Sequence, residues 1–315
     1  AMSRPMRAAS PAPARSGMAS GIGSVRARVM SMTAPCGAWA AAGSGVAMMP
    51  GATRPAPAPI STWRRVAAKG CKAISFLGAP HAFDLPSLLS GHWDPMLAAI
   101  SDTGMVLSLH IGAAWSLIRL APEAPVDHLI VVPSQATMLT AQDLLFGPTL
   151  RRFPQLKVAL SEGGIGWIPF YLDRVDRHYK NQAWIDNSFG DKMPSDVFRE
   201  HILACFITDP SGLRARNDIG IDLIAWECDY PHTDTTWPFS PEQLWGELQQ
   251  AKCTDDEIHK ITWQNACRFF DWDPFAHTPR EQANVAALRA RASDVDTTRI
   301  PRAEWKLRNE AAGVA

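Results

Sequence analysis

The stretch IDLIAWECDYPHTDTTWP, residues 221–238, joins an apolar run to a cluster of polar side chains. The run Ile221–Trp226 predicts a buried strand. Four polar residues follow it: Glu227, Asp229, His232 and Asp234. Parallel α/β folds place their chemistry at the carboxyl ends of such strands. This stretch therefore predicts a parallel α/β fold with a functional site just beyond the strand.

Two earlier segments have the same design. MVLSLHIG, residues 105–112, predicts a strand over Met105–Leu109 that ends at His110. KVALSEGG, residues 157–164, predicts a strand over Lys157–Leu160 that delivers Glu162. Three strands that each end in a possible metal ligand indicate a shared site, whereas one such strand would carry little weight.

The chain from Trp63 onward predicts five alternating strand–helix units with parallel strands. Gly70 closes an amphipathic helix in the C′ position, and a loop is expected over residues 77–91. The expected strands are Ala73–Phe76, Met105–Leu109, Lys157–Leu160, Ile202–Thr208 and Ile221–Trp226. Helices are expected over Pro95–Thr103 and Trp167–Asn181, and a helical turn over Arg214–Ile219. Three further helices are expected to begin at capping boxes. The boxes are Thr140–Asp143, Ser240 before the helix 241–251, and Thr254 before the helix 255–268. A closed (β/α)₈ barrel needs eight units over about 250 residues, so the prediction is a TIM-like α/β barrel that is incomplete at its N-terminal side.

Composition excludes several classes of protein. The 315 residues are 46% hydrophobic and 20% charged with no formal net charge, which argues against a nucleic-acid partner held by bulk electrostatics. The six cysteines form no C-x-x-C pair, which favours a reducing, cytoplasmic compartment. No segment predicts a membrane-spanning helix. Of the twelve tryptophans, Trp115 and Trp167 fall near the predicted site and are candidates for an aromatic substrate wall.

Residues 1–62 differ from the rest because they contain six Arg and no Asp or Glu. Three interpretations stay open: a disordered leader, an organellar transit peptide, or the translation of a wrong reading frame ahead of the genuine coding region. The abrupt change near Trp63 favours the third. The expected organisation is a leader over 1–62, a barrel domain over 63–278 and a C-terminal helical extension over 279–315.

From about Trp63 to about Lys306 the chain resembles the amidohydrolase 2 family, the branch of metal-dependent amidohydrolases that includes aminocarboxymuconate semialdehyde decarboxylase. The resemblance is carried by SGHWDPMLAAI at 90–100, LSLHIG at 107–112, FPQLKVALSEGGIGWIPFYLDRVDR at 153–177, WECDYPHTDTTWP at 226–238 and ITWQNACRFFDWD at 261–273. It implies a distorted (β/α)₈ barrel with a divalent metal at the C-terminal mouth, usually Zn²⁺, with Mn²⁺ as an alternative.

The resemblance also implies roles for single residues. His110 matches the metal-binding His of the fifth strand, and Asp229 matches the Asp of the eighth strand, which binds metal and handles the proton of the bound water. Glu162 stands where many relatives carry a catalytic His, so it is a candidate for orienting substrate or moving a proton, with a carboxylate bonded to the Gly163–Gly164 amides as the alternative. His232 is a candidate for anchoring the loop and contacting substrate. The family's first strand carries an H-x-H or E-x-H pair, and this sequence contains no H-x-H.

Three functions follow as alternatives. The first is a metal-dependent hydrolase or decarboxylase acting on a small aromatic or cyclic carboxylic acid. The second is a catalytically impaired remnant without a complete metal site. The third is a protein of the same fold that binds a ligand without chemistry. An open five-stranded sheet would expose an apolar edge, which predicts self-association such as a homodimer.

Overall fold

The computed structural model describes residues 60–111, 118, 121–182, 184–185, 189–232, 234–298 and 301–311. Five parallel strands form its centre, which confirms the predicted number and order of strands. They are β1 (Ala73–Leu77), β2 (Val106–His110), β3 (Lys157–Ser161), β4 (Ile202–Phe206) and β5 (Ile224–Trp226).

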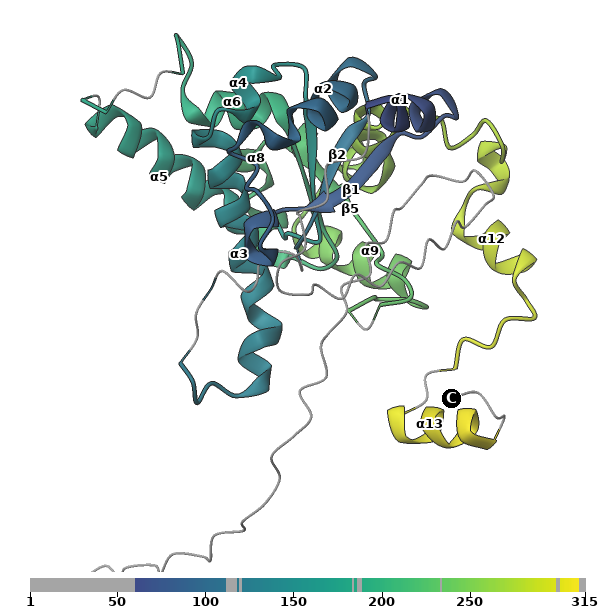
Figure 1. Ribbon diagram of the computed structural model, residues 1–315. Coiled ribbons are helices and arrows are strands. Elements are labelled where there is room, and N and C mark those ends of the chain that lie inside the picture. The colour runs from purple at the N-terminus through teal and green to yellow at the C-terminus, as the bar shows by residue number, and fades with distance from the viewer. Residues whose placement is uncertain are drawn as a thin grey trace, which may run out of the picture.

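The strands lie side by side in chain order, β1-β2-β3-β4-β5, which is the arrangement of one arc of a β/α barrel (Figure 1). Within the described residues, β1 and β5 are the two edges of the sheet. In the β2–β3 pair His110 lies opposite Ser161, so these two strands end at the same level. Side chains that follow the strands are therefore gathered along one edge.

Helices connect the strands, and most of the expected ones are present. The helices and helical turns are α1 (Ile60–Ala68), η1 (Pro80–Phe83), η2 (Gly91–Trp93), α2 (Asp94–Asp102), α3 (Val126–Phe146), α4 (Thr149–Arg152), α5 (Ile168–Asn181), α6 (Pro194–His201), α7 (Pro210–Arg214), α8 (Arg216–Ile219), η5 (Ile221–Leu223), α9 (Ser240–Gln250), α10 (Asp255–His259), the π-helical turn η6 (Lys260–Gln264), α11 (Asn265–Phe269), η7 (Arg280–Gln282), α12 (Val285–Arg291) and α13 (Arg302–Ala311). The helix α6 was not anticipated, and the first half of the predicted strand Ile221–Trp226 is the turn η5 instead.

The two faces of the sheet are packed differently because side chains alternate along each strand. Leu107, Leu160 and Phe206 belong to the large core, which also contains buried residues of α2, α3, α5 and α6. The opposite face carries a smaller cluster of Val106, Ala159, Leu203, Cys205 and Ala225, packed against Ala266, Phe269 and Phe270 around α11. The helix α11, which follows β5 in the chain, thus covers part of the second face.

Two predicted capping boxes are wrong. Thr140 does not begin a helix, because α3 starts at Val126 and runs through it; Ala136, Thr140 and Leu144 are buried at helical spacing along one continuous face. Ser240 lies inside α9, whose N-cap is Phe239, and the Ser240 hydroxyl accepts a hydrogen bond from Thr236 at 2.8 Å. The box at Thr254 is confirmed, since Thr254 and Glu257 exchange their two hydrogen bonds.

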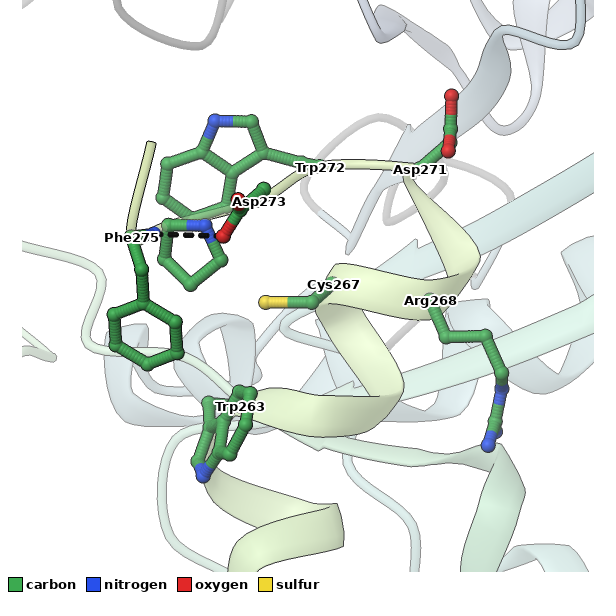
Figure 2. A pocket seen from close by; sticks show the side chains of 8 residues that line it. Trp263, Cys267, Arg268, Asp271, Trp272, Asp273 and Phe275 are labelled. Atoms are coloured by element: carbon green, nitrogen blue, oxygen red, sulfur yellow. Dashed lines mark hydrogen bonds between the residues drawn. The ribbon is translucent and has the colours of Figure 1, made fainter. Parts of the chain in front are cut away.

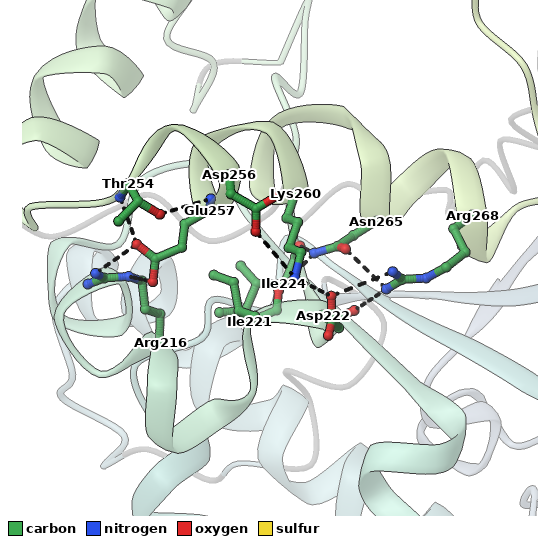
Figure 3. Close-up of polar contacts among 10 residues, drawn as sticks. All are labelled: Arg216, Ile221, Asp222, Ile224, Thr254, Asp256, Glu257, Lys260, Asn265 and Arg268. Carbon is green, nitrogen blue, oxygen red and sulfur yellow. Dashed lines mark hydrogen bonds and ion pairs between the residues drawn. The ribbon is translucent and has the colours of Figure 1, made fainter.

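A polar network holds the segment that leads into the amino end of β5 (Figure 3). Arg216 donates to both carboxylate oxygens of Glu257, at 2.9 and 3.0 Å, and to the carbonyls of Leu213, Ala251 and Lys252. Asn265 donates to the carbonyls of Ile221 and Ile224 at 2.8 Å. The helices after β5 are therefore joined to the chain that enters it.

The C-terminal extension lies at the periphery. Arg289 of α12 pairs with Glu242 of α9, and α13 lies apart from the sheet and its helices (Figure 1). The expected leader, 1–62, lies outside the described residues except for 60–62, which begin α1. Among the helices that the structure describes, none combines the length and apolar character needed to cross a membrane.

Candidate functional site

Polar side chains gather where β2, β3 and β5 end. His110 is the last residue of β2, Glu162 follows β3 directly, and Asp229 lies three residues after β5. Glu162 and Asp229 both have left-handed backbone, with φ of 59° and 56°. Such values are uncommon for residues other than glycine and cluster at functional sites. The backbone therefore holds both carboxylates in conformations that extended strand residues do not adopt.

Two carboxylate–imidazole contacts make up the site. Nε2 of His110 lies 2.8 Å from Oε1 of Glu162, and Nδ1 of His232 lies 2.7 Å from Oδ2 of Asp229. Both carboxylate side chains are only 14% exposed, whereas the imidazoles are 52% and 61% exposed. The carboxylates thus form the floor of the site and the imidazoles lie between them and solvent.

The turn after β3 is held by hydrogen bonds from its own backbone. The N–H of Glu162 donates to Oε1 of Glu227, and the N–H of Gly164 donates to the carbonyl of Cys205 at 3.1 Å. The N–H groups of Ile165 and Gly166 both donate to Oδ2 of Asp209 at 2.7 Å. Four backbone N–H groups of one short turn are therefore satisfied by three acceptor residues, one in β4, one between β4 and β5, and one directly after β5.

Electrostatics separates the pKa values of the acids. Burial raises the pKa of Asp229, and the neighbouring charge of Glu162 raises it further. Burial opposes ionisation of Glu162 too, but its hydrogen bond with His110 and the charge of that imidazole outweigh burial and lower the pKa of Glu162. The same hydrogen bond raises the pKa of His110. The pKa shifts therefore favour a charge on Glu162 and disfavour a second negative charge on Asp229.

The donor set fits a divalent cation. Glu162, Asp229 and His232 each offer one ligand atom, and these atoms lie within 4.8 Å of one another. Two zinc–ligand bonds together span about 4.2 Å, so small side-chain movements would bring all three atoms onto one ion. His110 is not in this group of three and contacts it through Glu162. Carboxylate oxygen and imidazole nitrogen are both donors that zinc accepts, and carboxylates also suit manganese.

A cavity of about 310 Å³ opens beside Glu162. Trp167 forms part of its wall, and its indole N–H donates to the carbonyls of Gly163 and Gly164 at 3.1 Å. The predicted wall residue Trp167 therefore lies beside the predicted acid Glu162, whereas Trp115 lies outside the described residues. The cavity is lined by Ser134, Glu162, Gly163, Gly164, Gly166, Trp167, Ile207, Thr208, Asp209 and Asp234.

A larger hollow, of about 530 Å³, is formed by residues between Trp263 and Phe275 (Figure 2). Its walls include Trp263, Cys267 and Trp272, and the guanidinium of Arg280 lies 5.4 Å from the centre of the Trp263 ring. Asp271, which also lines it, pairs with Lys72 just before β1, so the hollow is at the amino ends of the strands. Since parallel α/β folds use the carboxyl ends, the smaller cavity is the better candidate for chemistry.

Glu162→Gly should separate the ligand role of this residue from its backbone role. Glycine adopts φ of 59° without steric cost and keeps the N–H that Glu227 accepts, and this relief should offset the loss of the contact with His110. The free energy of unfolding of the metal-free protein should therefore change by no more than about 1 kcal/mol. Affinity for Mn²⁺ should fall strongly. Urea unfolding and titration calorimetry measure the two effects. The control is Ser161→Gly in β3, which should only destabilise; a large stability loss in Glu162→Gly would contradict the role given to the left-handed backbone.

Glu227 should make the metal-free protein less stable as pH rises. Burial of its carboxyl group raises the pKa of Glu227 to about 8 from an ordinary value of 4.5. The folded state therefore keeps a proton that the unfolded chain releases, and the free energy of unfolding should fall between about pH 4.5 and pH 8 by up to about 1.4 kcal/mol per pH unit. Glu227→Gln should flatten this part of the profile in urea unfolding. An unchanged slope in the variant would show that other groups cause it.

Three site residues were not assigned roles by the sequence analysis. Glu227 was noted only as a member of the polar cluster, and nothing in the sequence indicates that its side chain reaches the backbone of Glu162. Asp234 lines the cavity from a loop. Asp209 could have been found, because an Asp before Pro210 is a typical N-cap, and its Oδ1 accepts the N–H of Gly212 at 2.8 Å.

The fold and site together define a protein of the β/α-barrel class with a candidate metal centre at the carboxyl ends of its strands. A family model described as "Amidohydrolase" matches residues 3–272, so this chain belongs to the amidohydrolase family. The match includes most of the segment 1–62, which the sequence analysis set apart.

Solved structures show similarity in fold. An amidohydrolase from Mycobacterium avium subsp. paratuberculosis K-10 is 21% identical with a TM-score of 0.52 over 67% of this chain and 54% of that protein. The 5-carboxyvanillate decarboxylase LigW from Sphingomonas paucimobilis is 20% identical with a TM-score of 0.53 over 68% and 63%. A dihydroxybenzoic acid decarboxylase from Polaromonas sp. JS666, solved with bound manganese and 2-nitroresorcinol, is 20% identical with a TM-score of 0.48 over 67% and 64%. This chain thus spans between half and two thirds of each relative, and no curated protein matches it by sequence.

Proposed function

We propose that this protein is a metal-dependent hydrolase or decarboxylase that acts on a small aromatic or cyclic carboxylic acid. The observation that carries the proposal is the convergence of Glu162, Asp229 and His232 within 4.8 Å beside a cavity at the carboxyl ends of the strands. Membership of the amidohydrolase family supports it. The likeness in fold to a decarboxylase of an aromatic acid supports the substrate class.

The proposed ligands are Glu162, Asp229 and His232. The sequence predicts Asp229 and His110 as ligands, and His110 contacts the group of three through Glu162. A divalent ion bound there would polarise a substrate oxygen and lower the pKa of a bound water to about 7. Asp229, whose pKa burial raises, would accept the water proton in a hydrolysis or direct protonation of the ring carbon in a decarboxylation. His110 would orient Glu162 through its 2.8 Å contact. Trp167 would cover one side of the substrate ring.

The test is metal content followed by activity. The full chain would be loaded with Zn²⁺ or Mn²⁺, dialysed, and analysed for bound metal by mass spectrometry; we expect about one ion per chain. The loaded protein would then be assayed with a panel of hydroxybenzoates for CO₂ release and with cyclic esters and amides for hydrolysis. Well under one equivalent of either metal would contradict the proposal.

A second candidate function is ligand binding by a catalytically impaired member of the family. The missing H-x-H and the five-stranded sheet of the described residues favour it. Binding of an aromatic acid to the metal-free protein, with no turnover after metal loading, would support this alternative over the first.

We further propose a homodimer and a cytoplasmic location. The five cysteines in the described part are all free, as a reducing compartment would keep them.

A further inference from the structure

Glu227 joins two strand ends that are not neighbours in the sheet. It follows β5, and its Oε1 accepts the backbone N–H of Glu162, which follows β3. β4 lies between these two strands. The N–H of Glu227 donates to the carbonyl of Phe206, the last residue of β4, at 3.0 Å, so Glu227 is itself attached to the middle strand. Its side chain therefore extends from β5, past the end of β4, to the turn after β3.

The position of this hydrogen bond within the turn gives it a specific effect. Further along the turn, Gly164, Ile165 and Gly166 are held by other acceptors, Cys205 and Asp209. Glu227 holds the N–H of the peptide that leads into the left-handed residue Glu162, where φ is 59°. This bond fixes the plane of the peptide before Glu162, and the bonds of Gly164, Ile165 and Gly166 fix the chain after it, so Glu162 is held from both sides. The Glu227 hydrogen bond thus acts on the direction of the Glu162 side chain.

We propose that Glu227 is a positioning residue for the candidate metal centre: an oxygen of its carboxyl group accepts the Glu162 N–H and thereby holds the Glu162 carboxylate against Asp229 and His232. The metal-binding part of this inference rests on the proposed function. The geometric part, in which Glu227 fixes the Glu162 peptide, is independent of any metal. Outer-shell partners of this kind alter metal affinity about 10- to 100-fold when they are removed.

The test uses two substitutions that differ in one property. Glu227→Gln replaces the carboxyl group with an amide that keeps an acceptor oxygen at the same place, and Glu227→Leu removes the acceptor. We expect Mn²⁺ affinity, measured by titration calorimetry on the full chain, to fall at least about tenfold in Glu227→Leu and to stay within about threefold of wild type in Glu227→Gln. Arg216→Met, at the opposite end of β5, is the control: it should lower stability without changing affinity.

A second measurement works on the metal-free protein. Hydrogen exchange of the Glu162 amide, followed by NMR, should accelerate at least about tenfold in Glu227→Leu and remain near the wild-type rate in Glu227→Gln, because only the first variant leaves the N–H without an acceptor. Equal loss of Mn²⁺ affinity in both variants would show that an acceptor oxygen at this position is not what Glu227 contributes and would overturn the proposal. Unchanged exchange in Glu227→Leu would also overturn it. If wild type binds no metal, the proposed function fails, and exchange alone decides whether Glu227 positions Glu162.

Discussion

Asp229→Asn should weaken Mn²⁺ or Zn²⁺ binding by more than about 100-fold, since loss of an outer-shell partner already costs 10- to 100-fold. Asp229 contributes one of the three converging ligand atoms, and its carboxylate is only 14% exposed, so solvent screens it poorly. Asparagine keeps the size and tolerates the left-handed backbone at φ 56°. Folding should therefore survive, and titration calorimetry should report the loss of binding alone.

The matched control is Asp222→Asn. Asp222 belongs to the turn that leads into β5, is exposed, and pairs with Lys260 and Arg268 at 3.4 and 3.5 Å (Figure 3). The substitution is identical and the distance along the chain is short, but Asp222 is at the amino end of the strand. Metal affinity should therefore be unchanged in Asp222→Asn. Wild-type affinity in Asp229→Asn would remove the candidate metal centre as described.

Arg216→Met should destabilise the fold by about 3 kcal/mol, because removing one partner of a largely buried ion pair leaves the other charge without compensation. The Arg216 and Glu257 side chains are only 11% and 16% exposed. The substitution would also deprive three backbone carbonyls of a donor, each worth roughly 1 kcal/mol. Urea unfolding followed by tryptophan fluorescence measures the change.

A double substitution tests whether the pair is the cause. Arg216→Met with Glu257→Met should be less destabilised than the sum of the single variants, since neither charge is then left alone. Lys192→Met breaks the exposed pair with Glu200, whose atoms lie 2.7 Å apart, and should have little effect because both side chains are about half exposed. Strict additivity in the double variant would show that Arg216 acts through its other contacts.

Strands were the most predictable part of the fold. Apolar runs such as Val158–Leu160 are buried on both faces in a parallel sheet, so their hydrophobicity alone identifies them. Helix starts were less predictable where a polar residue faces the interior. Thr140 resembles an N-cap in sequence, but it is buried in the middle of α3, and its neighbours Ala141 and Leu144 continue the helix. Packing against the rest of the protein determines whether such a residue caps a helix or lies inside one, and the local sequence pattern does not show this packing.

The sequence predicted which polar residues follow the strands but not the contacts that they make. The ends of three strands identified His110, Glu162 and Asp229, because parallel strands bring their carboxyl ends to one edge. The pairing of His232 with Asp229 and the bond from Glu162 to Glu227 depend on how loops fold back over the sheet. No periodicity in the sequence encodes those loop conformations, so only the three-dimensional structure reveals them.

The left-handed backbone at Glu162 and Asp229 has a consequence for how this protein would drift under mutation. Each acid codon becomes a glycine codon by one nucleotide change, and glycine relieves the backbone at both positions. In a randomised library screened only for soluble expression, glycine should therefore accumulate at 162 and 229. Screening the same library for metal retention should restore the acids, so the enrichment ratio between the two screens would report how strongly function opposes folding at each position.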